Sequence, residues 1–279
     1  MNNILEVNGL VKRYPAFSLD NISFSLPEGC VTGFIGANGA GKTTTIRSIL
    51  NLAHKDVGVV KIFGLDADAH EQEIKDRIGI VMDSSYFYND LSMKDMKSIV
   101  APAYSKWSDA DYRAYMEKFE LDPKQKISTL SRGMRMKYAL VLALSHQAEL
   151  LIMDEPTSGL DPVSRDDLLD VLLALCDGGK SVLFSTHITS DLDKCAHNII
   201  YIRGGRIIAD APTREFEDSY RIAVYRDGEG AEDEKYFLGK RRERDGFTAL
   251  VSAADAPRLG RSCEKADLES IMVHLEKGV

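Results

Sequence analysis

The stretch Gly36-Ala37-Asn38-Gly39-Ala40-Gly41-Lys42-Thr43, followed by Thr44, decides how this chain folds. It has the form GxxxxGK[ST], in which glycines let backbone N–H groups turn inward and approach phosphate oxygens closely. The apolar run Val31 to Ile35 precedes it, and a helical pattern follows from Ala40 to Leu52. A strand, a glycine-rich loop and a helix in this order predict a phosphate-binding turn, because the helix N-terminus adds its positive dipole.

Two side chains of this loop carry further chemistry. Lys42 supplies a point charge for the β- and γ-phosphates of a nucleotide, and the hydroxyl of Thr43 can bind Mg²⁺. The alternative is a glycine-rich turn that matches the pattern by chance. The strand before the loop and the helix after it argue against that alternative.

A second group of acidic residues ends an apolar run. Leu150 to Met153 has no polar alternation, which predicts a parallel strand covered on both faces, and Asp154 and Glu155 follow it directly. Burying carboxylates there is costly unless they are paired or bind a metal. Asp154 suits a Mg²⁺ partner, and Glu155 suits a general base that polarises an attacking water. The alternative is a plain helix N-cap after a strand.

The rest of the chain alternates between strand and helix patterns. A helix opens at Asp161-Pro162, a strand covers Ser181 to Ser185, and Gly204-Gly205 predicts a hairpin. This alternation predicts an α/β fold with a parallel sheet. Further short strands are expected at Ile4 to Leu10, Ser18 to Leu26 and Val57 to Phe63, and a mostly helical region from Asp90 to Ala148.

Composition narrows the class of protein. The 279 residues are 44% hydrophobic with a net charge of −8. This length and hydrophobic content are enough for one large domain or one and a half. The negative net charge is unfavourable for binding nucleic acid, which needs clustered basic residues. The basic run Lys240 to Arg244 is expected to be a solvated turn. We find no signal-peptide pattern and no apolar run near the ~20 residues that span a bilayer, so membrane work would require partners.

Three further segments carry a family resemblance. Leu130-Ser131-Arg132-Gly133-Met134 resembles the LSGGQ signature of ATP-binding-cassette (ABC) ATPases, Ser158-Gly159-Leu160-Asp161 matches their D-loop, and His187 matches their switch histidine. In this order, residues 1–212 resemble the ATP-binding subunit of an ABC transporter. The variant signature and the tail resemble bacterial ABC-2-type drug and peptide exporter ATPases.

The resemblance implies a fold and a way of working. The fold is the P-loop NTPase fold of ABC ATPases: a RecA-like core, an antiparallel β-subdomain and a helical insertion at about 84–148, with a small α+β appendage at 213–279. Two copies, identical or not, would sandwich two ATP molecules head to tail. Ser131 and the Gly133 N–H of one copy would then contact the γ-phosphate held by the other. Permease subunits on separate chains would hold the protein at the inner, cytoplasmic face of the membrane.

Individual residues inherit expected roles in the same way. Tyr14 resembles the aromatic that stacks on adenine, although it could be an ordinary strand tyrosine; Asp161 belongs to the D-loop, and His187 would contact the γ-phosphate. Asp83 stands where the family usually has glutamine, and we expect it to keep a Mg²⁺-sensing role; the alternative is contact with solvent or backbone only. Arg132 and Met134 replace the usual Gly and Gln, which leaves accessory contacts open.

Three functions remain open at this point. The first is the ATP-hydrolysing subunit of a transporter. Tyr86-Phe87-Tyr88 is then a candidate wall of the groove that receives the permease, and the alternative is local core packing of the insertion. The second is a soluble single-cassette ATPase that acts as an assembly scaffold. The third is a regulatory cassette that binds ATP without hydrolysis, against which the retained Glu155 and His187 argue. The transported substrate and its direction are not determined.

Overall fold

The computed structural model describes residues 2–82 and 87–278. Its centre is a six-stranded sheet with strand order β10-β9-β3-β8-β7-β6. Neighbouring strands are parallel except for the β9–β10 hairpin. The strands are β3 (Val31–Ile35), β6 (Ile78–Val81), β7 (Leu150–Asp154), β8 (Ser181–Thr186), β9 (Asn198–Arg203) and β10 (Arg206–Pro212). Every residue of β3, β7 and β8 is buried, which confirms the predicted parallel α/β sheet.

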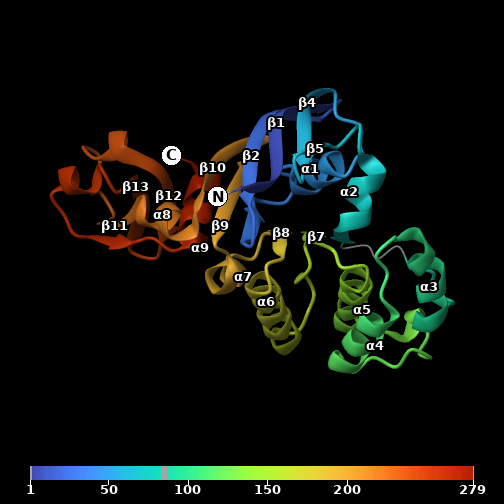
Figure 1. Ribbon diagram of the computed structural model, residues 1–279. Coiled ribbons are helices and arrows are strands. Elements are labelled where there is room, and N and C mark those ends of the chain that lie inside the picture. Colours follow the sequence, from blue (N-terminus) through green and yellow to red (C-terminus); the bar gives the residue numbers. More distant parts are fainter. Residues whose placement is uncertain (1, 83–86, 279) are drawn as a thin grey trace.

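An antiparallel sheet lies next to this centre (Figure 1). Its strands, in the order β2-β1-β4-β5, are β1 (Asn3–Tyr14), β2 (Phe17–Pro27), β4 (Val57–Ile62) and β5 (Leu65–Asp66). Helix α1 (Lys42–Ile49), which begins within the glycine-rich loop, shares one buried cluster with both sheets: Ile46 of α1 belongs to the same cluster as Leu10, Leu19 and Phe34. The loop is therefore held by two sheets at once.

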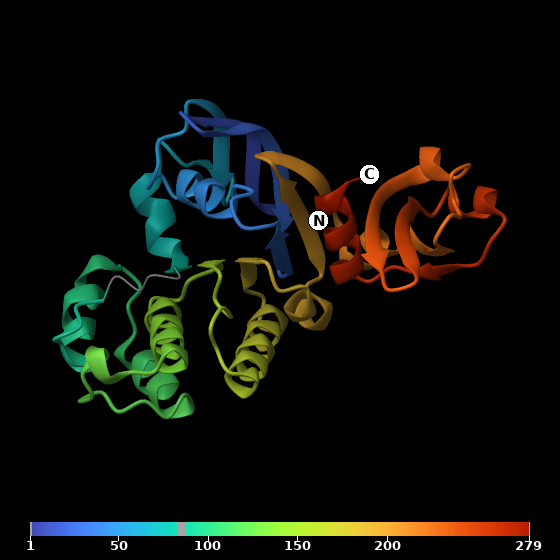
Figure 2. The same cartoon turned by 180° about the vertical axis from the view of Figure 1, so that it is seen from behind.

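The described residues 87–149, between β6 and β7, are mostly helical, as predicted. They contain α3 (Met93–Val100), α4 (Asp109–Lys118) and α5 (Arg132–Ser145), which follow α2 (Glu71–Arg77), and the short 3₁₀ turns Ala101–Ala103 and Ile127–Thr129. Figures 1 and 2 show α3, α4 and α5 gathered at the end of the molecule away from the antiparallel sheet. The hydroxyl of Tyr138 donates to Met93 O at 2.6 Å and ties α5 to α3.

Two helices connect the core strands beside the site. Helix α6 (Pro162–Asp177) follows β7, and α7 (Thr189–Cys195) follows β8. The carboxylate of Asp161 caps α6 by accepting from the N–H groups of Val163 and Ser164. Within residues 2–82 and 87–278, no helix combines the length and apolar character needed to cross a bilayer.

The C-terminal part is a small α+β unit, as expected. After α8 (Thr213–Asp218) comes an antiparallel sheet in the order β12-β13-β11-β14, and α9 (Leu268–Lys277) closes the chain. The strands are β11 (Tyr220–Arg226), β12 (Phe237–Glu243), β13 (Gly246–Ser252) and β14 (Cys263–Lys265), with 3₁₀ turns at Glu234–Tyr236 and Ala256–Leu259. A domain boundary at 212/213 remains a prediction.

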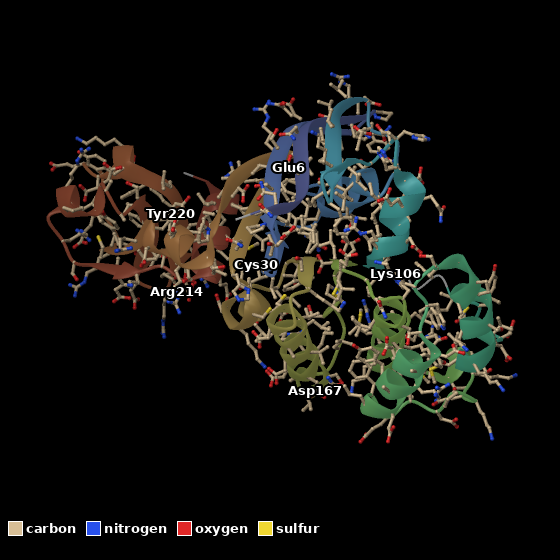
Figure 3. The ribbon with its side chains drawn as sticks, in the orientation of Figure 1. Glu6, Cys30, Lys106, Asp167, Arg214 and Tyr220 are labelled. Atoms are coloured by element: carbon tan, nitrogen blue, oxygen red, sulfur yellow. The ribbon has the colours of Figure 1, made fainter. Side chains whose placement is uncertain are left out.

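Aromatic and polar contacts join this unit to the core. Phe216 of α8 meets Tyr220, labelled in Figure 3, edge-on at 5.3 Å and Tyr201 of β9 at 6.5 Å. The hydroxyl of Tyr201 donates to Glu276 Oε1 of α9 at 2.7 Å. The C-terminal unit is thus anchored on the strand next to β3.

The basic run at 240–244 corrects one expectation. Residues 240–243 lie in β12 and pair with β13, and only Arg244 and Asp245 form the turn. Lys240 shows why a charged strand is stable here. Its ammonium lies 5.3 Å from the ring centroids of Phe237 and Phe247, so its alkyl stem covers aromatic surface while the charge stays near water.

Candidate active site

A cavity of about 660 Å³ lies at the carboxyl ends of β3, β7 and β8. Such edges are where open α/β sheets bind ligands. Its lining residues come from the start of β2, the glycine-rich loop, the turn after β7 and the end of β8. They are Ala16, Phe17, Ala37, Asn38, Gly39, Gly41, Lys42, Thr43, Thr44, Glu155, Ser158 and His187. The fold has brought together most of the predicted loop, one predicted carboxylate and the predicted histidine.

Two glycines of the loop are required by the packing around them. Gly41 has φ +116°, and a Cβ there would lie 2.7 Å from Leu19 Cδ2. A Cβ at Gly36 would lie 2.3 Å from the carbonyl oxygen of Ile202. The glycines therefore let the loop pack closely against β2 and β9.

The side chain of Lys42 reaches back to the start of the glycine-rich loop. It is buried, and its ammonium donates to the carbonyl oxygen of Gly36 at 2.7 Å and lies 3.2 Å from Glu155 Oε1. A buried ammonium needs such acceptors. The geometry keeps one positive charge at the floor of a polar cavity, where a phosphate group would meet it.

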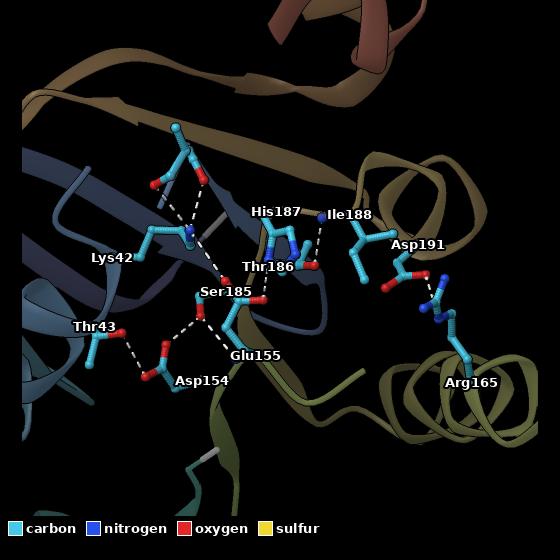
Figure 4. Close-up of polar contacts among 12 residues, drawn as sticks. Lys42, Thr43, Asp154, Glu155, Arg165, Ser185, Thr186, His187, Ile188 and Asp191 are labelled. Carbon is cyan, nitrogen blue, oxygen red and sulfur yellow. Dashed lines mark hydrogen bonds and ion pairs between the residues drawn. The ribbon is translucent and has the colours of Figure 1, made fainter. Parts of the chain in front are cut away.

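The two carboxylates at the end of β7 point to different partners (Figure 4). Asp154 accepts from the hydroxyls of Thr43 at 2.8 Å and of Ser185 at 2.6 Å. Glu155 has φ +50°, an uncommon conformation for a residue other than glycine. This left-handed turn aims its carboxylate at Lys42 and at His187, whose Nδ1 lies 2.8 Å from Glu155 Oε2. Strained backbone of this kind is concentrated at functional sites.

The donor set beside Thr43 fits a magnesium ion. The Thr43 hydroxyl and the Asp154 carboxylate are oxygen ligands in contact with each other. Mg²⁺ in nucleotide sites takes one or two such ligands and completes its shell with phosphate oxygens and water. Asp83, the third predicted ligand, lies outside the described residues.

Other predicted residues lie away from this cavity within the chain. Tyr14 is 46% exposed at the end of β1 and is absent from the lining, where Phe17 and Ala16 appear instead. Its adenine contact stays a prediction. The backbone N–H of Met134 donates to Ser131 Oγ at 3.2 Å, so Ser131 caps α5, with Gly133 half-buried behind it. Arg132 packs on the D-loop, where a Cβ on Gly159 would lie 2.6 Å from its guanidinium.

The aromatic segment after β6 is only partly described. Tyr86 lies outside the described residues. The ring of Phe87 packs against Tyr138 at 5.3 Å, and Tyr88 is 63% exposed. One aromatic therefore serves the packing of α5 and the other faces outward.

A family model described as "ABC transporter" matches residues 19–158. The chain is also 33% identical to the daunorubicin/doxorubicin resistance ATP-binding protein of Streptomyces peucetius, over 98% of this chain and 86% of that protein. This chain belongs to the ABC transporter family. Within that family it is an ATP-binding subunit, which binds and hydrolyses ATP.

Further similarities place this ABC subunit among bacterial ATP-binding proteins. It is 31% identical to the bacitracin transport ATP-binding protein of Bacillus licheniformis, over 76% of this chain and 71% of that protein. Among solved structures, it matches an ATP-binding subunit of an ABC transporter with a TM-score of 0.69 and 27% identity, over 76% of this chain and 93% of that one. The P-loop ABC-ATPase fold is confirmed.

Sequence reasoning missed Ser185 and, among the lining residues, Ala16 and Phe17. Ser185 lies opposite Asp154 in the β7–β8 register and holds both acidic residues, since its hydroxyl also accepts from Glu155 N at 3.1 Å. Phe17 reaches the cavity from the start of β2. A hydroxyl at the end of an apolar strand was the available signal for Ser185, whereas nothing local marks Phe17.

Proposed function

We propose that this chain is the motor of a bacterial exporter and hydrolyses ATP in the cavity at the carboxyl ends of β3, β7 and β8. One observation carries the proposal. Glu155 Oε1 lies 3.2 Å from the ammonium of Lys42, and Glu155 Oε2 lies 2.8 Å from Nδ1 of His187. The neighbouring carboxylate of Asp154 accepts from the hydroxyl of Thr43. A cation, a base and the Thr43 hydroxyl thus line one cavity large enough for a nucleotide, and that hydroxyl donates to Asp154.

Each side chain has a role in this proposal. The loop N–H groups and Lys42 bind the β- and γ-phosphates, and Thr43 and Asp154 hold Mg²⁺, which when bound neutralises charge on the phosphate oxygens. Glu155 accepts a proton from the attacking water. His187, paired with Glu155 and 41% exposed, contacts the γ-phosphate and orients that carboxylate. Tyr14 stacks on adenine and Asp83 senses the metal.

The proposal extends to partners. Residues 131–134 do not line the cavity of their own chain. This fits a role in which they contact the nucleotide held by a second cassette. Ser131 opens α5, so the N-terminal dipole of a 14-residue helix stands behind it and favours an anion. We infer that two cassettes close on ATP through Ser131, Gly133 and Asp161. Permease subunits on other chains then hold the pair at the cytoplasmic face, with Tyr88 on the receiving surface.

The test is ATP turnover by the purified chain. Glu155→Gln should lower kcat by about 10²–10⁴-fold, the usual contribution of a general base, while ATP still binds. Glu149→Gln is the matched control, because Glu149 precedes the same strand at its other end and pairs with Arg77 on the surface. Equal losses in both variants, or full turnover with Glu155→Gln, would overturn the assignment.

The transporter role has a separate test. Where a multi-span membrane protein is encoded beside this chain, co-expression should recover both proteins in one detergent-extracted complex. ATP turnover in that complex should respond to transported compounds. A chain that never associates with membranes and is unaffected by any permease would favour the scaffold alternative instead.

A further inference from the structure

Three polar side chains meet beneath the site, between α6 and α7, and two of them, Asp191 and Thr157, are buried. Asp191, in the first turn of α7, is 1% exposed, and its Oδ1 lies 3.8 Å from Nε of Arg165 in the first turn of α6 (Figure 4). Thr157, from the turn after Glu155, is fully buried beside them. Asp191 Oδ2, Arg165 Nε and Thr157 Oγ1 have no hydrogen-bond partner within residues 2–82 and 87–278.

Such a group is unusual in a folded core. Buried polar atoms are almost always hydrogen-bonded, because leaving one unpaired forfeits its hydration without compensation. Here the Asp191–Arg165 pair is longer than a hydrogen bond, and Thr157 lies near the carboxylate without bonding to it in good geometry. A small shift of the first turn of α6 toward α7 would bring Arg165 Nε within hydrogen-bond distance of Asp191 Oδ1 and make this contact a charge-assisted hydrogen bond.

The cluster joins the two segments that carry the catalytic pair. Thr157 lies two residues after Glu155, in the loop that ends at Asp161, the N-cap residue of α6. Asp191 lies four residues after His187. Burial raises the pKa of Asp191, and the charges of Arg165, Glu155 and His187 all act on it. The carboxylate is therefore within electrostatic reach of both members of the 2.8 Å pair.

A second set of contacts also holds α6 against α7. The same two helices are joined at the surface by Lys194, whose ammonium lies 2.5 Å from Asp166 Oδ1 and 2.7 Å from Asp170 Oδ1. A buried ion pair is in any case weak evidence for a stabilising role, because desolvation offsets its attraction. The position of Asp191 behind His187 indicates a different purpose.

We propose that Asp191 and Arg165 are positioning residues that set His187 against Glu155 according to the position of the 157–161 loop. The inference rests on the proposed function, in which Glu155 and His187 act on ATP. Asp191 holds the first turn of α7, and Arg165 links that turn to the helix that begins at Asp161. A cassette partner that moves the loop would thereby adjust the histidine.

The experiment compares Asp191→Asn and Arg165→Gln with the surface control Lys194→Ala. Each Asp191 or Arg165 variant should lower kcat about tenfold, with ATP affinity within about twofold of wild type. The double variant should have about the same kcat as the less active single variant, as expected for residues that act as a unit. Lys194→Ala should keep kcat within about twofold, because it loosens the same helices without touching Asp191. Arg165 is 31% exposed, so its variant tests the idea even if Asp191→Asn fails to fold.

Three outcomes would overturn the proposal: unchanged kcat in both variants, an equal loss with Lys194→Ala, or additive losses in the double variant. His187→Ala separates this failure from that of the proposed function. If His187→Ala keeps full turnover, the assigned site is wrong and the inference falls with it. If His187→Ala loses turnover while Asp191→Asn and Arg165→Gln do not, only the positioning role is wrong.

Discussion

At the scale of single residues, the hydroxyl of Ser185 contacts both acidic residues of the candidate site. It donates to Asp154 and accepts from the backbone of Glu155, so one buried atom orients the proposed metal ligand and fixes the start of the strained turn. Partners of this kind orient ligating carboxylates and change metal affinity when removed. Its position at the end of β8 places it one strand away from the residues that it serves.

We therefore predict that Ser185→Ala raises the Mg²⁺ concentration for half-maximal ATP turnover about tenfold, within the 10–100-fold effect of such partners. A Mg²⁺ titration of turnover measures this. Ser181→Ala is the control, because Ser181 is equally buried at the other end of β8 and accepts from Gly29 N at 2.9 Å. A shift of the same size in both variants would argue against a role at the metal.

At the scale of elements, helix α5 connects the signature at its start with a buried histidine at its end. Ser131 caps the N-terminus, and His146 follows Ser145 at the C-terminus. The imidazole is 1% exposed and stacks on Tyr104, with ring centroids 3.8 Å apart. Burial lowers the pKa of His146 to about 4 from 6.5, because the charged form is poorly solvated there.

This pKa makes the fold sensitive to acid. In the unfolded chain His146 binds a proton near pH 6.5, and in the folded chain only near pH 4. The contribution of neutral His146 to the free energy of unfolding is therefore complete above pH 6.5 and falls as the pH drops toward 4. His146 alone should remove about 2 kcal/mol between pH 7.5 and pH 5. His146→Phe keeps an aromatic ring against Tyr104 without a titrating group. Urea unfolding at both pH values should show a smaller acid loss for the variant, and equal losses would contradict the assignment.

At the scale of the whole molecule, the C-terminal unit shares its packing with the ATPase core. Ile271 and Leu275 of α9 belong to the same buried cluster as Leu192 of α7 and Tyr201 of β9. Figures 1 and 2 show α9 between the C-terminal sheet and the core. Because the contact is apolar and buried, we expect the unit and the core to unfold together.

Ile271→Ala should test this coupling. Ile271 is fully buried, so the change should cost about 2–5 kcal/mol and lower the Tm by about 5 °C or more in one transition. ATP turnover per folded molecule should be retained, because Ile271 does not line the cavity. Val224→Ala, on the same C-terminal sheet but 57% exposed, should leave the Tm nearly unchanged. A separate low-temperature transition would show that the unit melts independently.

The sequence by itself determined the features that depend on local patterns. The glycine-rich loop, the apolar strand before Asp154, the Asp161-Pro162 helix start and the Gly204-Gly205 hairpin could all be predicted, because each is set by residues within one turn or one strand. The lysine and carboxylate types in those segments sufficed to predict a triphosphate site and, through the signature, the family.

Only the tertiary structure decided which side chains meet. Ser185 reaches Asp154 because β7 and β8 pair in one register, and a shift by one residue would turn the hydroxyl to the other face. Arg165 and Asp191 meet because α6 packs on α7, and 240–243 became a strand because β13 lay beside it. These contacts join residues far apart in the chain, so their geometry follows from packing of the whole core rather than from local pattern.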